Sequence, residues 1–365
     1  MKISRISLRS ETGKFVHLAL ALTLLYFGIF HFLAFLLLVI DVIFLWKKAR
    51  KLFFLFSILA IFFCLRLFSL SENLIISGET NLLGTVLEVQ DDRLYLSANG
   101  KYLVYCQEIE AIVPGDIIEI EGAFFEIESK QIPYGFDYDT YLLSSGIKGV
   151  LKANTIAKIG HSFSFASIPY AIRNYVVAVM PEKAAEYVLL LTFGDDFLTN
   201  ENIMRTWSEL SVVHLFAISG MHVGLIAAFL DKMQKNAGVP AKARKIVLVI
   251  LLIAFNLATG FRIPVFRATI LYIAAFFQKK NPTISSLDRL SLLFVGMALY
   301  NPWYLENVGF RLSFLVCFCL MLGRKIIGRN KKGNLISVTL MANICSLPVT
   351  LSLNHGIGLL FLPAN

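Results

Sequence analysis

The longest apolar run of the sequence, Phe15 to Trp46, limits what this chain can fold into more than any other feature. As one helix rising about 1.5 Å per residue it would measure about 48 Å, whereas the hydrocarbon core of a bilayer is about 30 Å thick. Two shorter helices that turn near Gly28–His31 fit better, and residues 52–70 form a third apolar run. The first run also starts too late and is too long for a cleaved signal peptide. We therefore expect about three transmembrane helices in residues 1–71.

The composition also indicates a lipid environment. Hydrophobic residues make up 57% of the chain, charged residues 16%, and the mean hydropathy is +0.69. An average soluble domain has about a quarter of its residues charged. The five cysteines indicate no disulfide framework. Because no CxxC, HExxH, HxHxD or P-loop motif is present, we expect no metal or cofactor and no hydrolase or ATPase activity.

The charge is distributed unevenly along the chain. Residues 78–160 carry 6 Lys/Arg and 13 Asp/Glu, a net charge of −7, while the rest carries 28 Lys/Arg and 12 Asp/Glu, a net charge of +16. This asymmetry predicts an acidic soluble insert at 78–160 between two basic membrane portions, residues 1–71 and 164–365.

The insert has the pattern of short β-strands. The runs "GTVLEV", "RLYLS", "KYLVY" and "DIIEIEG" are separated by the turn signals "ANGK" and "VPGD". Strands at this spacing predict a small closed or partly closed barrel of OB-like topology, with a five-stranded sandwich as the alternative. The predicted fold class is therefore a polytopic α-helical membrane protein with an inserted small all-β extracytoplasmic domain. The acidity of this domain argues against strong nonspecific DNA binding by the insert itself.

Residues 164–365 alternate apolar spans with basic or Gly/Pro-rich breaks, after an amphipathic, interfacial-type segment at 165–180. The expected spans are 212–230, 246–259, 265–277, 290–300, 310–322 and 335–353. Placing the N-terminus, the "KKARK" segment and the later basic loops in the cytoplasm satisfies the positive-inside rule. The acidic insert then lies on the outer face of a multi-pass cytoplasmic-membrane protein.

The stretch "HLFAISGMHVGLI", residues 214–226, carries polar groups inside an apolar segment. On one continuous helix turning about 100° per residue, two faces separate. The polar face comprises Ser211, His214, Ser219 and His222. The small-residue face comprises Ala217, Gly220 and Gly224, and the two glycines form a GxxxG pattern that allows close helix packing. We expect the polar face to line a path, and the alternative is that both faces only pack.

Four arginines fall at the outer ends of the expected spans, against the positive-inside trend: Arg66, Arg262, Arg267 and Arg311. Together they would form an electropositive mouth that attracts phosphates. The alternative is that each arginine snorkels to the interface or pairs with an acid such as Glu306, Asp195 or Asp196.

The sequence blocks together resemble the ComEC family, membrane proteins of natural competence. "HLFAISGMHVGLI" resembles the most recognisable block of that family. Other blocks resemble the family in the same order: "IPYGFDYDTYLLSSGIKG", "TGFRIPVFRATILY", "NPWYLENVGFRLSFLV" and "SLPVTLSLNHGIGLLFLPAN". Two features depart from it. Ser211 stands where relatives often have Gly, and the metallo-β-lactamase-like domain of many relatives is not seen, so we expect a short form or a fragment.

The resemblance implies a channel component that carries single-stranded DNA into the cytoplasm during natural transformation. The implied partners are single-stranded DNA, membrane lipid, other competence-machinery proteins including a separate energy source, and a second copy of the chain in a homo-oligomer. The residues expected along the substrate path are His214, Ser219, Gly220, His222, Arg262, Arg267 and Arg311.

Two other functions fit the same pattern less well. A small-solute or ion transporter would reuse the polar helix, but the sequence shows no inverted repeat. A membrane-embedded hydrolase would use Ser219 and His222, but the G-x-S-x-G pattern and a nearby acid that would orient the histidine are both missing.

Overall fold

The computed structural model describes residues 13, 15–29, 31–72, 78–90, 92–106, 111–125, 137–209, 218–276, 284–323 and 331–354. Their contacts divide the chain into two compact units. Unit 1 comprises residues 1–74, 140–146 and 277–346, and unit 2 comprises residues 75–139, 147–276 and 347–365. Because unit 2 joins the acidic insert to residues 164–276, the domain boundaries expected from the sequence stay a prediction.

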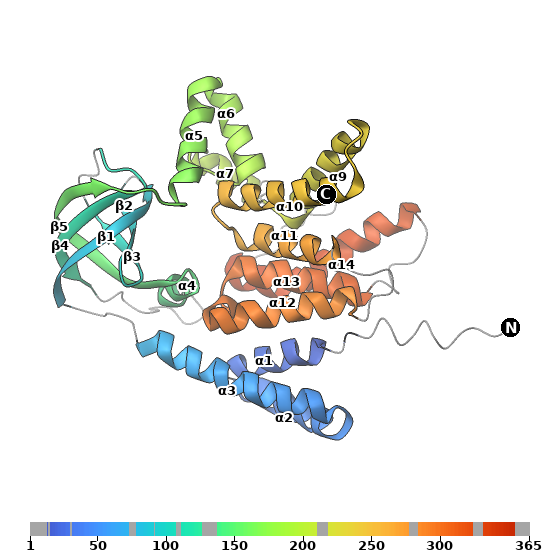
Figure 1. Cartoon of the computed structure of the whole chain (residues 1–365). Helices are drawn as coiled ribbons and strands as arrows, with labels where there is room; N and C mark the ends of the chain where they lie inside the picture. The colour runs from blue at the N-terminus through green and yellow to red at the C-terminus, as the bar shows by residue number, and fades with distance from the viewer. Residues whose placement is uncertain are drawn as a thin grey trace. The chain divides into compact units, whose positions relative to one another are not determined.

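Unit 1 begins with three helices, as the apolar runs predict: α1 (Val16–Gly28), α2 (Phe32–Lys48) and α3 (Arg50–Glu72) (Figure 1). The chain leaves helical structure between α1 and α2 at the expected turn, and α1 packs against both other helices. Among the described residues, one helix has both the length and the apolarity needed to cross a bilayer, the Arg50–Ser71 part of α3. The first portion therefore forms three helices, one of which has the character of a full membrane span.

The later helices of unit 1 are α12 (Ser286–Tyr300), the short 3₁₀-helix η2 (Pro302–Leu305) and α13 (Val308–Leu322). Side-chain caps define each start: Ser285, Asn301 and Asn307 accept hydrogen bonds from backbone N–H groups of the first turns. α12 and α13 pack through an aromatic cluster of Phe294, Phe310 and Phe314. These helices match the predicted spans at 290–300 and 310–322.

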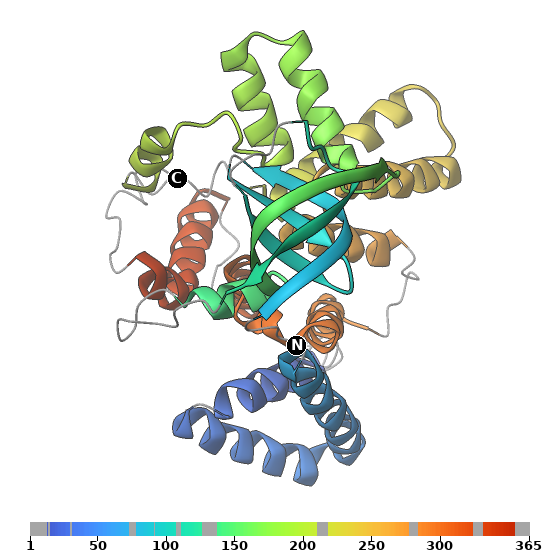
Figure 2. The ribbon, with the colours of Figure 1, turned by 90° about the vertical axis from the view of Figure 1, so that its left-hand side faces the viewer.

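Unit 2 contains one five-stranded sheet: β1 (Gly78–Gln90), β2 (Arg93–Ser97), β3 (Lys101–Tyr105), β4 (Asp116–Phe124) and β5 (Ile147–His161). The sheet curves strongly (Figure 2). β1 pairs antiparallel with both β2 and β4, and β5 pairs parallel with β3 and antiparallel with β4. The pairing order β1-β2-β3-β5-β4 therefore returns to β1. The part of the chain that the structure describes is mostly helical, with this sheet as its β element.

The inward side chains of the sheet alternate with outward ones, as the sequence of β4 predicts. Ile118 and Ile120 are buried, whereas Glu119 and Glu121 are exposed. The sheet core also includes residues from the other strands, among them Val86, Leu94, Leu96, Val104 and Leu151. The four strands read from the sequence are all present. The last strand, β5, was not among them, because its buried residues do not alternate: Gly149, Val150 and Leu151 are consecutive.

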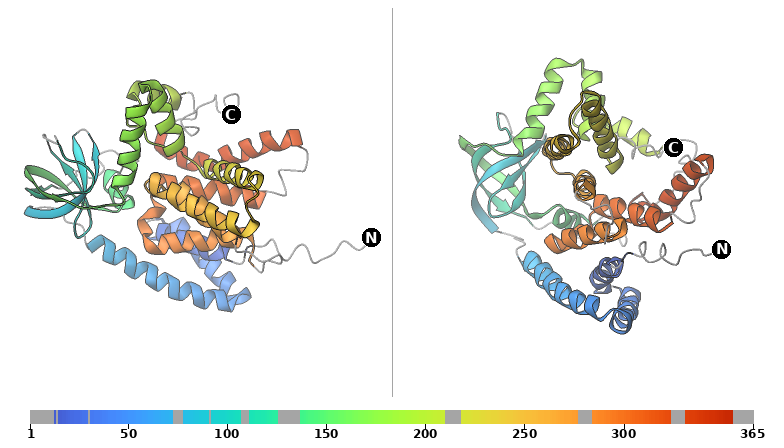
Figure 3. Two further views of the ribbon diagram at one scale, coloured as in Figure 1. Left: turned by 45° about the horizontal axis from the view of Figure 1, so that its top comes forward. Right: turned by 45° about the vertical axis from the view of Figure 1, so that its right-hand side comes forward.

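The helices of unit 2 follow the sheet in the chain. They are α5 (Ser167–Val179), α6 (Glu182–Val188), the π-helical turn η1 (Leu189–Phe193), α7 (Glu201–Glu209), α9 (Gly220–Asn236), α10 (Ala241–Ala258) and α11 (Ile263–Phe276). α9, α10 and α11 pack against one another (Figure 3). Two helices cross the boundary between the units in sequence: the short α4 (Tyr138–Ser144) and the long α14 (Lys331–Asn354).

Candidate functional site

Ser219 begins helix α9 rather than lying inside it. Its backbone is extended, with φ −123° and ψ 167°, and its Oγ accepts a hydrogen bond from the N–H of Met221 at 3.3 Å. The helix expected to carry a continuous face over residues 211–222 therefore does not run through Ser219. A serine whose hydroxyl accepts a hydrogen bond from the backbone of the next turn favours a helix start. His214, with Ser211 and Ala217, lies outside the described residues.

His222 completes the cap from the first turn of α9. Its Nδ1 lies 3.0 Å from the backbone nitrogen of Ser219 and 3.0 Å from Ser219 Oγ. Because a backbone N–H can only donate, Nδ1 accepts in this geometry, and the ring proton of the neutral imidazole is on Nε2. Ser219 and His222 thus satisfy each other's backbone groups in a reciprocal capping box. This arrangement occupies the pair in holding the helix start.

Gly220 provides the close approach that the sequence predicts, but Gly224 does not. A Cβ on Gly220 would lie 3.0 Å from Nη2 of Arg267 and 3.3 Å from Cβ of Ala268, both on α11. A Cβ on Gly224 would meet no described atom within 4 Å. Among the described residues, close packing is therefore seen at Gly220 and not at Gly224, and the GxxxG packing face stays a prediction. The absence of a side chain at Gly220 lets the buried Arg267 guanidinium reach the start of α9.

A buried polar contact joins α10 to α11. The side-chain amide of Asn256 on α10 donates to Oγ1 of Thr269 on α11 at 2.6 Å and to the Leu252 carbonyl at 2.9 Å. Asn256 is 2% exposed, and its Oδ1 has no hydrogen-bond partner among the described residues. The sequence reasoning missed this pair because a single asparagine in an apolar helix forms no motif.

Arg262 lies on the turn between α10 and α11, next to a second turn of unit 2. That second turn contains Gly194 in the left-handed region at φ 67°, where a Cβ would lie 3.4 Å from Nη1 of Arg262 and 3.0 Å from Ile218. Ile218 directly precedes the Ser219 cap. The structure therefore brings Arg262, Ser219, Gly220, His222 and Arg267 into one region of unit 2.

A cavity of about 470 Å³ opens beside Arg262. It is bounded by strands β1 and β3, by helix α5 and η1, and by the α10–α11 turn, all within unit 2. Four aromatic side chains line it: Phe165, Tyr170, Phe193 and Phe261. Five charged side chains line it as well: Glu88, Lys101, Arg173, Asp195 and Arg262. A volume of this size is in the range of small-molecule and single-nucleotide sites.

Two of the charged groups in the cavity neutralise each other. Nε of Arg173 donates to Oδ2 of Asp195 at 2.6 Å, and the guanidinium lies over the ring of Phe197. The ammonium of Lys101 lies 4.6 Å from the ring centroid of Tyr95. Burial lowers the pKa of Lys101, and the nearby carboxylate of Glu88 opposes that shift. With the Arg173–Asp195 pair neutral and Glu88 offsetting the charge of Lys101, Arg262 gives the cavity its positive character.

The remaining predicted arginines belong to unit 1 and have partners there. Arg311 forms an ion pair with Glu306, donates to the Leu305 carbonyl and lies over the ring of Phe27. Arg66 donates from Nε to the Tyr300 carbonyl at 3.3 Å. Arg311 therefore pairs with an acid, Glu306. This is the alternative to the electropositive mouth that the sequence left open for the outer arginines.

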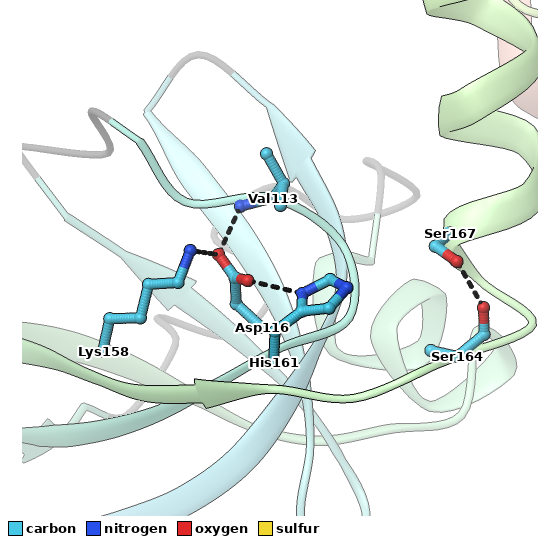
Figure 4. Close-up of polar contacts among 6 residues, drawn as sticks. All are labelled: Val113, Asp116, Lys158, His161, Ser164 and Ser167. Atoms are coloured by element: carbon cyan, nitrogen blue, oxygen red, sulfur yellow. Dashed lines mark hydrogen bonds and ion pairs between the residues drawn. The ribbon is translucent and has the colours of Figure 1, made fainter.

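A second polar cluster, inside the sheet, was not anticipated (Figure 4). The fully buried Asp116 accepts from Nζ of Lys158 at 2.7 Å, from Nδ1 of His161 at 2.7 Å and from the N–H of Val113 at 2.9 Å. Burial alone would raise the pKa of Asp116, but the hydrogen bonds from Lys158, Val113 and His161 outweigh it and hold that pKa below its ordinary value. The cluster joins the start of β4 to the end of β5.

Metal binding finds no support in the described part of the chain, where no group of three or more His, Cys, Asp or Glu side chains is placed to hold an ion.

Burial, with Asp92 nearby, raises the pKa of the Cys106 thiol to about 11, which keeps it in the unreactive thiol form near neutral pH.

Comparison with known proteins gives the family. The model of the Competence protein family matches residues 191–365. ComE operon protein 3 of Bacillus subtilis (strain 168) is 29% identical over 71% of this chain and 34% of its own length. Uncharacterised proteins of Mycoplasma pneumoniae and Mycoplasma genitalium are each 28% identical, over 45% and 56% of this chain and 44% and 51% of their own lengths.

The matched part of the chain thus spans between a third and about half the length of these relatives. No solved structure matches. The family match covers α9, α10 and α11, and therefore Ser219, Gly220, His222 and the two arginines that the structure places beside them. The match of residues 191–365 and the similarity to ComE operon protein 3 support a competence protein of the ComEC family.

Proposed function

We propose that this protein is a cytoplasmic-membrane channel component that carries single-stranded DNA into the cytoplasm during natural transformation. Membership of the ComEC family supports a role in DNA uptake for competence. In this proposal the protein crosses the membrane several times, and the acidic sheet of unit 2 is an OB-like domain on the outer face. The return of the strand order to β1 and the positive-inside distribution of basic residues support that arrangement.

The cavity beside Arg262 is the observation that carries the proposal. Proteins that hold single strands without sequence preference combine cationic groups for the phosphates with aromatic faces for the bases. Here Arg262 and Lys101 supply the cations, and Phe165, Tyr170 and Phe261 supply aromatic rings in one space. The cavity therefore offers a single nucleotide unit the two kinds of contact that a passing strand needs.

The region around the start of α9 has a supporting role in this proposal. Ser219 and His222 fix the helix start, and Gly220 admits Arg267 beside it, so that the α10–α11 turn holds Arg262 at the cavity. We assign Arg311 to stabilising η2 and α13 through Glu306, outside the DNA path. Energy and partner proteins come from other components of the competence machinery, and a homo-oligomer is compatible with this role.

The experiment is transformation with charge variants of the cavity. Arg262→Ala and Lys101→Ala each remove one cation from the lining, and we expect each to lower transformation by about tenfold, the effect of losing about 1.4 kcal/mol of phosphate contact. Lys183→Ala is the matched control, because it removes one positive charge from an exposed position of α6 outside the lining. Equal transformation in all three variants at equal protein level would remove the cavity from the proposed path.

A small-solute or ion transporter is the second candidate, because a cavity of about 470 Å³ also accommodates a small organic ion. It predicts that the cavity variants change the uptake of that solute and leave transformation unchanged. A membrane-embedded hydrolase is disfavoured by the contacts of Ser219, whose hydroxyl holds the helix start together with His222. We therefore propose no catalytic role for this pair.

A further inference from the structure

An ionisable pair joins the first two helices of unit 1. Nδ1 of His17 on α1 lies 2.8 Å from Oδ1 of Asp41 on α2. Apart from Asp41, α2 is apolar until Lys47 and Lys48 at its end. At about 1.5 Å per residue, Asp41 lies about 9 Å along the helix from Lys47. The pair therefore lies within the apolar length of α2, away from its basic end.

Only one of the two carboxylate oxygens of Asp41 has a hydrogen-bond partner among the described residues. Asp41 is 8% exposed, and Oδ2 has no hydrogen-bond partner among the described residues. A buried ionised oxygen without a donor is costly, and protonation removes its charge. Ionisable side chains within apolar membrane helices are rare and commonly mark sites where a proton or ion binds. The unsatisfied Oδ2 thus provides a specific atom for a proton.

His17 holds the other carboxylate oxygen and connects the pair to the surface of the protein. An ionised carboxylate can only accept, so Nδ1 of His17 carries a hydrogen when Asp41 is ionised. The imidazole stacks on the ring of Phe44, with centroids 4.9 Å apart. Its side chain is 38% exposed, whereas that of Asp41 is 9% exposed. The geometry gives the buried acid a partner whose side chain reaches the surface of the protein.

Other ionisable groups lie on α1 and α2 and on the elements that pack against them: Tyr26, Lys47, Lys48, Arg50, Lys51, Cys64, Arg66, Asp288, Arg289, Tyr300 and Tyr304. Several of them have described contacts elsewhere, including Asp288, Arg66 and Arg50. Asp288 accepts from the N–H of Phe15 and from Ser285, Arg66 donates to the Tyr300 carbonyl, and Arg50 lies over Trp46. Among the described residues, the hydrogen bond of Asp41 is the one with His17.

We propose that the His17–Asp41 pair is a reversible proton-binding site within the apolar helices of unit 1. A proton from solution adds to Oδ2 of Asp41, an O–H bond forms, and the carboxylate becomes a carboxylic acid. The charge of the pair rises by one, and release of the proton reverses the step. The site requires no DNA and does not rest on the proposed function. It makes the charge between α1 and α2 depend on the proton concentration that reaches them.

The experiment is an infrared pH titration of the full chain in lipid nanodiscs. The wild-type spectrum minus the Asp41→Asn spectrum isolates the carboxylic-acid C=O stretch of Asp41. We expect a band that appears reversibly as the pH is lowered and is lost in Asp41→Asn. His17→Gln keeps the acid but removes its titratable partner, so the midpoint of the band should shift. Asp196→Asn and His31→Gln, at exposed positions, should leave the band and its midpoint unchanged.

A purely structural pair would give a different result. Asparagine keeps an acceptor oxygen for His17, so a purely structural role predicts unchanged helix packing in Asp41→Asn and a wild-type band whose midpoint His17→Gln leaves unchanged. A difference band that is absent at every pH, or present and constant at every pH, contradicts the proposal. Should Asp41→Asn fail to fold, isotope-edited spectra of the wild type and His17→Gln decide the matter. Equal midpoints in those two proteins would also contradict it.

Discussion

Ser219 shows how one side chain sets the geometry of a larger region. Its hydroxyl and the ring of His222 satisfy the backbone groups that the start of α9 leaves unpaired. Ile218, one residue earlier, contacts the Gly194 turn that also meets Arg262. A change at residue 219 should therefore loosen the first turn of α9 and, through it, the neighbours of the cavity.

We expect Ser219→Ala to cost about 1 kcal/mol of local stability, because alanine offers no acceptor for the first-turn N–H groups. Ser219→Thr keeps the hydroxyl and should restore most of the loss. Hydrogen exchange of the peptide that contains Met221 and His222 measures the effect directly. If Ser219 were a nucleophile, Ser219→Thr would be as inactive as Ser219→Ala. Equal loss of hydrogen-exchange protection in both variants would count against the capping role.

The two glycines of the central block provide a matched pair at the same scale. Gly220→Ala brings a Cβ to 3.0 Å from the Arg267 guanidinium, so the arginine must shift and transformation should fall severalfold. Gly224→Ala meets open space among the described residues and gains about 1 kcal/mol of helix propensity, so function should be unchanged. Transformation at equal protein level checks both, and a larger defect in Gly224→Ala would contradict the observed packing.

At the scale of elements, the Asp116 cluster ties the beginning of β4 to the end of β5. A carboxylate whose pKa is lowered by folding stabilises the folded state fully above its unfolded pKa of about 3.9. That contribution disappears as the pH falls through the lower pKa of the folded state. Acidification below about pH 4 should therefore weaken this part of the sheet.

We predict that Asp116→Asn makes strands β4 and β5 less protected at neutral pH and removes their extra loss of protection in acid. Hydrogen exchange of the two strands, corrected for the intrinsic rate at each pH, measures both effects. Glu119→Gln is the control, because that carboxylate is exposed on the same strand. A wild-type protein that loses no more protection in acid than Asp116→Asn would show that the cluster does not stabilise the sheet through its charge.

The same elements show what the sequence could and could not predict. Strands β2 and β3 are found at the residues expected, because alternating β-branched and aromatic residues end at clear turn signals. The turn between α1 and α2 follows from the length of the apolar run. The start of α9 was misplaced. The hydrophobic periodicity of the sequence continues through Ser219, whereas the hydrogen bonds of the Ser219 side chain make this residue the N-cap of α9.

The candidate site was predictable only in part for a related reason. Arg262, Arg267 and Gly220 stand out in the sequence by their charge or small size. Lys101 and Arg173 do not, since each lies more than 80 residues along the chain from Arg262, with which it shares the cavity. Contacts between distant segments leave no periodic signal in one sequence.

At the scale of the whole molecule, unit 2 combines the acidic sheet with the helices of the central block, and the cavity lies among them. The family model covers those helices, and the sheet supplies Glu88 and Lys101 to the same lining. In the proposed function, DNA import therefore depends on residues of both the sheet and the helices.

The most direct measurement is import of fluorescently labelled DNA into the cytoplasm of a strain from which the gene has been deleted. The strain is restored with the intact gene, with Arg262→Ala, or with Lys183→Ala, and DNA inside the cell is scored by its resistance to added nuclease. The account predicts surface-bound DNA without import in the deletion strain, strongly reduced import with Arg262→Ala, and normal import with Lys183→Ala. Normal import in the deletion strain would contradict the proposed role in DNA transport.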